Sequence, residues 1–87
     1  MYQVKITADV IDPEDKEYLR VNAQLTELAR EYGCVRRVDY IGSVEVGIFT
    51  FPTRSACMQF RHSKEHSDAM SRVSQFYRTM TVSRHSD

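Results

Sequence analysis

Two of the three histidines, His62 and His66, stand four residues apart. On a continuous helix this spacing places both imidazoles on one face, as in many helical metal sites. A zinc site needs a third ligand, and Glu65 is not placed as the intervening acid of a zinc-protease helix. We therefore predict no metal site. Two interpretations remain for these histidines: acid–base groups, because histidine titrates near neutral pH, or solvent-exposed side chains in a polar stretch.

The two cysteines, Cys34 and Cys57, could in principle bind a metal or form a disulfide. They lack the spacing of metal-binding cysteines, and nothing in the sequence indicates secretion. Free cysteine is among the most often buried residue types, and thiols stay reduced in the cytosol. We predict two buried, reduced thiols.

Length and charge narrow the class of protein. A chain of 87 residues suits one domain spanning residues 1–87. Its 12 basic and 12 acidic residues cancel, so it lacks the positive charge of a nucleic-acid-binding protein. No apolar run is long enough to cross a bilayer, and the first residues lack the pattern of a secretory signal. We expect a cytoplasmic protein that binds neither nucleic acid nor membrane.

The predicted secondary structure begins with a strand and a helix. Residues 2–10 alternate between apolar and polar side chains, which predicts a half-buried strand. Asp12 is a candidate N-cap, and Pro13 suits the first position of a helix. Apolar residues then recur at helical spacing as far as Gly33, a fitting terminator. These marks predict one amphipathic helix of about five turns.

A hairpin follows the helix. Residues 34–41 and 44–51 are rich in β-branched and aromatic side chains. Gly42 and Ser43 between them form a two-residue turn, in which glycine supplies the positive φ. These features predict two antiparallel neighbouring strands.

A second helical region comes next. Pro52 and Thr53 end the hairpin and open a helix. The stretch after that helix fits either a short helix beginning at Ser67 or Asp68, or part of the last strand. We predict the short helix, followed by a final strand over residues 79–83.

The second strand of the hairpin carries large apolar residues in both of its alternating sets. Phe49 and Phe51 are expected to pack against the helices, which leaves Val44, Val46 and Ile48 on the other face of the sheet. A second copy placed sheet to sheet would cover these three side chains. We therefore predict a homodimer with the three residues at its interface. The alternative is a monomer in which neighbouring polar residues dilute the apolar patch.

Together these elements predict an α+β protein of the ferredoxin-like βαββαβ class. Its four-stranded antiparallel sheet has helices on one face, with a short extra helix before the last strand. Several features follow one another along the chain: an acidic, Pro-containing helix start, Gly33-Cys34, Phe51, Ala56, Phe60 and Ser63-Lys64-Glu65-His66. In this arrangement the chain resembles the antibiotic-biosynthesis monooxygenases, small proteins that pair as dimeric α+β barrels.

The resemblance implies a monooxygenase that needs no cofactor, neither metal nor organic. Its substrate would be a small aromatic or otherwise activated molecule, held in an apolar cavity between sheet and helices and oxidised with dioxygen. Such a reaction needs a base and a dry pocket that stabilises the resulting anion. The candidate residues are His66 as base with His62 second, Tyr40 or Tyr77 as hydrogen-bond donor, and Phe51 and Phe60 as cavity walls. The alternative for the four aromatic residues is an ordinary place in or around the core.

Two further functions are compatible with this topology. The RNA-recognition motif shares it, but Val46 and Ile48 stand where that motif has aromatic residues that stack on bases. We therefore predict no RNA binding. A non-catalytic module that holds a partner protein, such as a phage-encoded inhibitor or a regulatory subunit, remains the alternative. A sealed apolar cavity with an inward-facing His66 is expected of the enzyme, and a filled core with both histidines in solvent of the binding module.

Overall fold

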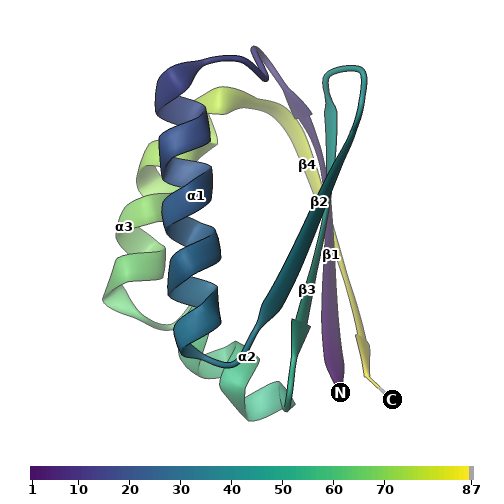
Figure 1. Cartoon of the computed structure of the whole chain (residues 1–87), viewed down its shortest axis with the longest axis vertical. Helices are drawn as coiled ribbons and strands as arrows, with labels where there is room; N and C mark the ends of the chain where they lie inside the picture. Colours follow the sequence, from purple (N-terminus) through teal and green to yellow (C-terminus); the bar gives the residue numbers. More distant parts are fainter. Residues whose placement is uncertain (87) are drawn as a thin grey trace.

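The computed structural model describes residues 1–86, which form four strands, three α-helices and one turn of 3-10 helix (Figure 1). The elements are β1 (Tyr2–Val10), α1 (Lys16–Glu31), β2 (Val35–Ile41), β3 (Val44–Phe51), α2 (Arg54–Arg61), α3 (Lys64–Val73), η1 (Ser74–Phe76) and β4 (Tyr77–Ser86). The predicted α+β class and ferredoxin-like order are confirmed, including the extra helix before the last strand. That strand is longer than predicted.

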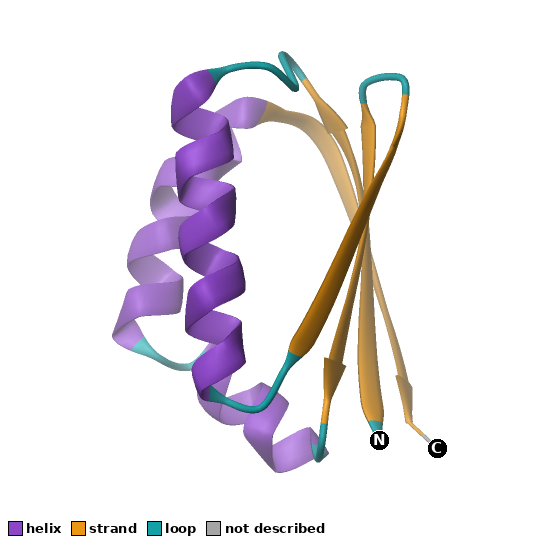
Figure 2. Ribbon diagram, viewed as in Figure 1, coloured by secondary structure: helices purple, strands orange, loops and turns teal. Residues whose placement is uncertain are grey.

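All four strands belong to one antiparallel sheet, in the order β2-β3-β1-β4. The helices lie on one side of this sheet, with α1 and α3 side by side (Figure 2). The helix α2 lies at the end of the sheet where the two chain termini are found (Figure 1). No helix within residues 1–86 is long and apolar enough to cross a membrane.

The first helix begins later than the sequence indicates. Its N-cap is Asp15, whose carboxylate accepts hydrogen bonds from the backbone N–H groups of Glu17 and Tyr18. Asp12 instead accepts from the N–H of Glu14 and closes the preceding turn. The predicted start at Asp12 was therefore wrong, because two aspartates three residues apart can each bond the following backbone and only one begins the helix. The 16-residue helix has between four and five turns.

The end of α1 matches the prediction. Gly33 has a φ of +78°, and the Cys34 N–H donates to the carbonyl of Ala29, as in the common glycine-terminated helix. A Cβ at Gly33 would lie 3.1 Å from the ring of Pro52. Glycine is therefore required here both by the backbone and by the space available.

The two short helices are separated at His62 and Ser63. His62 is the C-cap of α2, and Ser63 is the N-cap of α3, accepting a hydrogen bond from the His66 N–H at 3.1 Å. The predicted start at Ser67 or Asp68 was therefore wrong by one turn. His62 and His66 also do not share a helical face, because the helix is interrupted between them.

The strand β3 divides its side chains between the two faces of the sheet. Glu45, Gly47, Phe49 and Phe51 are buried toward the helices. Phe49 and Phe51 join a core built with α1, α2 and α3, as predicted. The three residues predicted for the other face, Val44, Val46 and Ile48, are partly buried there.

The face of the sheet opposite the helices is open. Its apolar residues lie on β2 and β3, whereas β1 and β4 contribute mainly polar ones. Among the apolar residues of this face, the two from β2 are the most exposed, Val35 at 66% and Ile41 at 74%. The apolar area on this face therefore extends beyond the three predicted residues.

Candidate functional site

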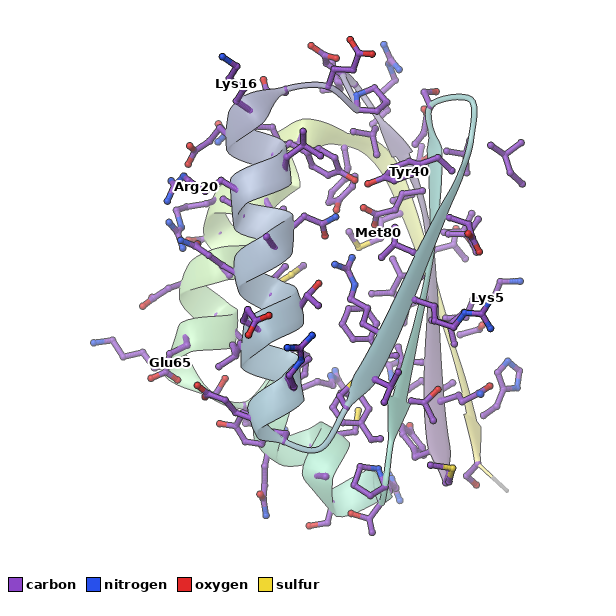
Figure 3. All side chains as sticks on the ribbon, in the orientation of Figure 1. Lys5, Lys16, Arg20, Tyr40, Glu65 and Met80 are labelled. Carbon is purple, nitrogen blue, oxygen red and sulfur yellow. The ribbon has the colours of Figure 1, made fainter. Side chains whose placement is uncertain are left out.

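A cavity of about 220 Å³ lies between the sheet and the helices. Every strand and every α-helix contributes to its wall. The lining residues are Val4, Ile6, Leu25, Arg36, Glu45, Phe49, Phe51, Cys57, Phe60, Arg61, His66, Met70, Val73, Tyr77, Met80, Val82 and Arg84. Apolar side chains dominate, as in most small-molecule sites. Figure 3 shows Met80 on the side of the sheet that faces the helices, whereas Lys5 points away from it.

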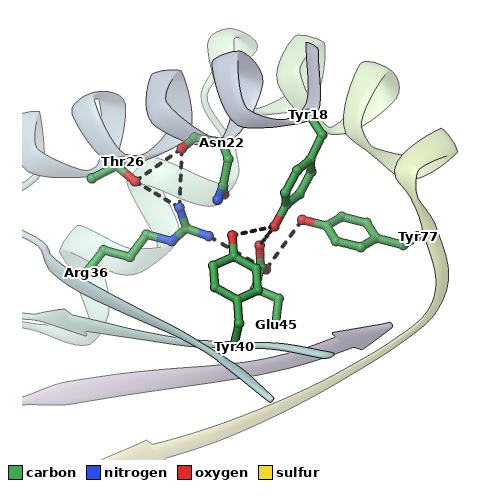
Figure 4. Close-up of polar contacts among 7 residues, drawn as sticks. All are labelled: Tyr18, Asn22, Thr26, Arg36, Tyr40, Glu45 and Tyr77. Carbon is green, nitrogen blue, oxygen red and sulfur yellow. Dashed lines mark hydrogen bonds and ion pairs between the residues drawn. The ribbon is translucent and has the colours of Figure 1, made fainter. Parts of the chain in front are cut away.

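A carboxylate lies at one end of this cavity. Glu45 is 2% exposed and accepts a hydrogen bond from the hydroxyl of Tyr18 (Figure 4). Tyr77 donates to its other oxygen at 3.4 Å. The hydroxyl of Tyr18 is also 2.8 Å from that of Tyr40, which is partly exposed. A chain of polar groups therefore leads from the cavity wall to the surface of the sheet.

The charge of Glu45 is balanced by Arg36 on the neighbouring strand. The two side chains are 2% and 4% exposed, and a guanidinium nitrogen lies 3.8 Å from the carboxylate. The guanidinium also donates to Thr26 Oγ1 at 2.8 Å and lies 4.8 Å from the centre of the Phe49 ring. Buried charges persist when they are paired and hydrogen-bonded in this way.

Burial and the neighbouring carboxylate keep the two inner tyrosines protonated. For Tyr18, burial and the hydrogen bond to Glu45 raise the pKa far above its usual range. Burial also raises the pKa of Tyr77, and the negative charge of Glu45 raises it further. Each effect disfavours the phenolate. Tyr77 therefore offers a stable O–H at the cavity wall.

His66 lies at another part of the wall. It is half-buried, and its ring meets that of Phe60 edge-on with the centroids 4.7 Å apart. Burial and the positive charge of Arg61 lower the pKa of His66 below its usual value of 6.5, partly opposed by a hydrogen bond with the Arg61 backbone. The imidazole is therefore mostly neutral at pH 7 and able to accept a proton.

The structure brings together some of the predicted site residues and separates others. His66, Phe51, Phe60 and Tyr77 all line the cavity. Tyr40 does not line it and reaches it only through Tyr18. His62 is exposed at the end of α2, away from the cavity wall.

Sequence reasoning missed the buried charge pair of Arg36 and Glu45. A signal for the acid was present, because Glu45 shares its position in the alternation of β3 with Phe49 and Phe51. A charged residue on the apolar face of a strand indicates a buried, paired group. Arg36 carried no comparable signal, since its strand has charged residues on both faces.

The thiols are as predicted. Cys34 and Cys57 are buried and unpaired. Burial raises the pKa of Cys34 to about 11, so its thiol is un-ionised at neutral pH. Within residues 1–86, no three His, Cys, Asp or Glu side chains are grouped as metal ligands would be.

Several solved structures have the same architecture as this chain. A structure described as an antibiotic biosynthesis monooxygenase superimposes with a TM-score of 0.78 and 19% identity, over 100% of this chain and 98% of that one. The chain has the fold of that protein. No protein-family model and no curated protein matches the sequence.

Two further structures have the same fold. The cofactor-independent oxygenase SnoaB of Streptomyces nogalater has a TM-score of 0.82 and 10% identity, covering 99% of this chain and 92% of that one. A conserved protein of Methanosarcina mazei has a TM-score of 0.85 and 12% identity, covering 97% and 89%. The resemblance to antibiotic-biosynthesis monooxygenases that the sequence suggests is therefore confirmed for the fold.

Proposed function

We propose that this protein is an oxygenase that oxidises a small, activated aromatic molecule with dioxygen and needs no cofactor. The observation that carries the proposal is the apolar cavity between sheet and helices, with a neutral histidine and a protonated tyrosine in its wall. The fold shared with a cofactor-independent oxygenase supports the same reaction class. The cavity is open along the inner side of β4 rather than sealed as expected, and the core is not filled as the protein-binding module would require.

The proposed reaction begins with a proton transfer. His66 accepts a proton from an acidic CH₂ group of the substrate, and the resulting carbanion is stabilised by delocalisation into the ring system. The carbanion then reduces dioxygen. In the overall balance the CH₂ group and one O₂ become a carbonyl group and one water, and the substrate supplies all four electrons that reduce the dioxygen.

The other wall residues have supporting roles in this proposal. The single O–H of Tyr77, which donates to Glu45 in this structure, turns to donate to the substrate oxygen on which negative charge develops. Phe51 and Phe60 exclude water and pack against the aromatic rings. Tyr40 does not contact the substrate and acts only through its hydrogen bond with the hydroxyl of Tyr18.

The test is oxygen consumption with anthrone, an aromatic compound whose CH₂ protons are acidic. We expect wild-type protein to consume one O₂ per anthraquinone formed, and His66→Ala to lose most of this activity, about a hundredfold or more. His62→Ala is the matched control, because His62 lies outside the cavity. Equal rates for wild type and His66→Ala would refute the role of this histidine. Failure to bind or oxidise any activated aromatic compound would favour the non-catalytic alternative.

The proposed functional unit is a homodimer. Val35, Ile41, Val44, Val46 and Ile48 form the apolar part of the uncovered sheet face, here called the outer patch. A small domain has little core of its own, so covering this patch with a second copy adds stability. Two sheets packed in this way correspond to the dimeric α+β barrel that the sequence suggests.

A further inference from the structure

The cavity is open along the inner side of β4. Met80, Val82 and Arg84 pair with Ala8, Ile6 and Val4 of β1, so they face the helices. The helices nevertheless leave them uncovered, with Met80 37% and Val82 38% exposed. The open side of the cavity therefore has an apolar stretch of strand that ends at an arginine.

A second arginine stands at the same end of the cavity. Both Arg61, from α2, and Arg84, from β4, line the wall, and both charges act on the thiol of Cys57 in the same wall. Arg61 also acts on His66. The two arginines thus belong to the same cavity wall, and Arg61 lies near enough to the candidate base to act on it.

Among residues 1–86, no acid forms an ion pair with either of these arginines. The ion pairs within residues 1–86 are Glu17–Arg20, Glu27–Arg30, Arg36–Glu45 and Asp9–Arg78. The single acid in the described cavity wall, Glu45, is already held by Arg36, Tyr18 and Tyr77. The wall therefore has an excess of positive charge at its open end and no negative charge to match it.

We propose that this cavity selects an amphipathic anion, whose ring body lies along Met80 and Val82 and whose acidic group is bound by Arg61 and Arg84. Paired guanidinium groups bind carboxylate, sulfonate or phosphate oxygens through charge-assisted hydrogen bonds. The inference deepens the proposed function, since it concerns the same cavity. It names the substrate class as aromatic molecules that carry an anionic group.

The test compares two fluorescent probes with nearly the same ring body. Anilinonaphthalene sulfonate carries an anion, and phenyl naphthylamine is its neutral counterpart. We expect wild-type protein to bind the sulfonate more tightly. The double variant Arg61→Gln/Arg84→Gln should weaken sulfonate binding about tenfold, with little change for the neutral probe. Competition by naphthoate and by naphthyl phosphate then distinguishes a carboxylate ligand from a phosphate ester.

Arg54→Gln is the matched control, because it removes a positive charge from the same helix α2 outside the cavity wall. It should leave both affinities unchanged. Arg84→Lys, which retains the charge, should keep most of the sulfonate affinity, and unchanged binding of the neutral probe shows that the double variant is folded. Equal affinity of wild type for both probes, or equal weakening of both in the double variant, overturns the anion selectivity while leaving the apolar cavity in place. If neither probe binds, the result contradicts the proposed function as well as the anion selectivity.

Discussion

The chemistry of the cavity depends on how the surroundings treat single side chains. His66 would be an ordinary surface histidine if α3 began one turn later. Instead its backbone N–H bonds the Ser63 cap and its ring lies against Phe60. Burial and the charge of Arg61 then favour the neutral form. The structure therefore places this histidine in the cavity wall, in surroundings that favour its neutral form.

The pKa of His66 can be tested directly. Arg61→Gln removes a positive charge that disfavours the imidazolium, so we expect the pKa of His66 to rise toward its usual value. The neutral, proton-accepting form would then be lost at a higher pH, and the acid limb of kcat/KM would move in the same direction. NMR titration of the imidazole measures the first effect without any substrate. Arg54→Gln serves as the control, and a fall in the pKa in Arg61→Gln would contradict the assignment.

At the level of the elements, one polar cluster joins the sheet to the long helix. Arg36 comes from β2 and Glu45 from β3, and α1 contributes Tyr18 and Thr26. Tyr77 adds the first residue of β4. The cluster therefore fixes how the elements meet at one end of the cavity.

Breaking the buried ion pair should be costly. Arg36→Met leaves the carboxylate of Glu45 buried without its cation, so we expect the free energy of unfolding to fall by about 3 kcal/mol. Arg36→Met combined with Glu45→Gln should recover part of this loss, because the uncompensated charge is gone. Urea unfolding followed by circular dichroism measures both effects.

Arg37→Met is the control for the ion pair, since Arg37 follows Arg36 in the strand but points to the opposite face of the sheet. It should change stability by less than about 0.5 kcal/mol. A similar loss in Arg36→Met and Arg37→Met would show that the pair contributes nothing specific.

At the scale of the whole molecule, the two faces of the sheet differ sharply. One face is covered by helices and encloses the cavity, whereas the other carries the outer patch without any covering element among residues 1–86 (Figure 2). Apolar patches of this kind are typical of association surfaces. The proposed dimer would bury this patch and leave the open side of the cavity, along the inner side of β4, on the opposite face of the sheet.

The dimer is tested by placing a charge in the outer patch. Ile48→Lys should convert the protein to a monomer, because a lysine facing a second copy would be buried without a partner. Light scattering after size-exclusion chromatography measures the mass. Gln59→Lys adds the same charge to an exposed position of α2 and should leave the mass unchanged. A folded Ile48→Lys protein with the mass of wild type would refute the sheet-to-sheet dimer.

The order of the elements and the two faces of β3 could be predicted from the amino-acid sequence alone. Local patterns carried this information: alternation in the strands, glycine after α1, and the Gly42 turn. Helix starts were less well determined, because several capping residues compete within one turn and tertiary packing selects among them. Asp15 was selected over Asp12, and Ser63 over Ser67.

Which side chains form the site depends on the packing of the elements in three dimensions. Arg36, Glu45, His66 and Arg84 lie on four different elements, and no local pattern relates residues so far apart in the chain. The cavity itself is a property of how the helices cover the sheet, since they protect β1 and β3 but leave the inner side of β4 open. Periodicity determines which way a side chain points, whereas the packing distance between layers determines whether it meets a partner, a cavity or water.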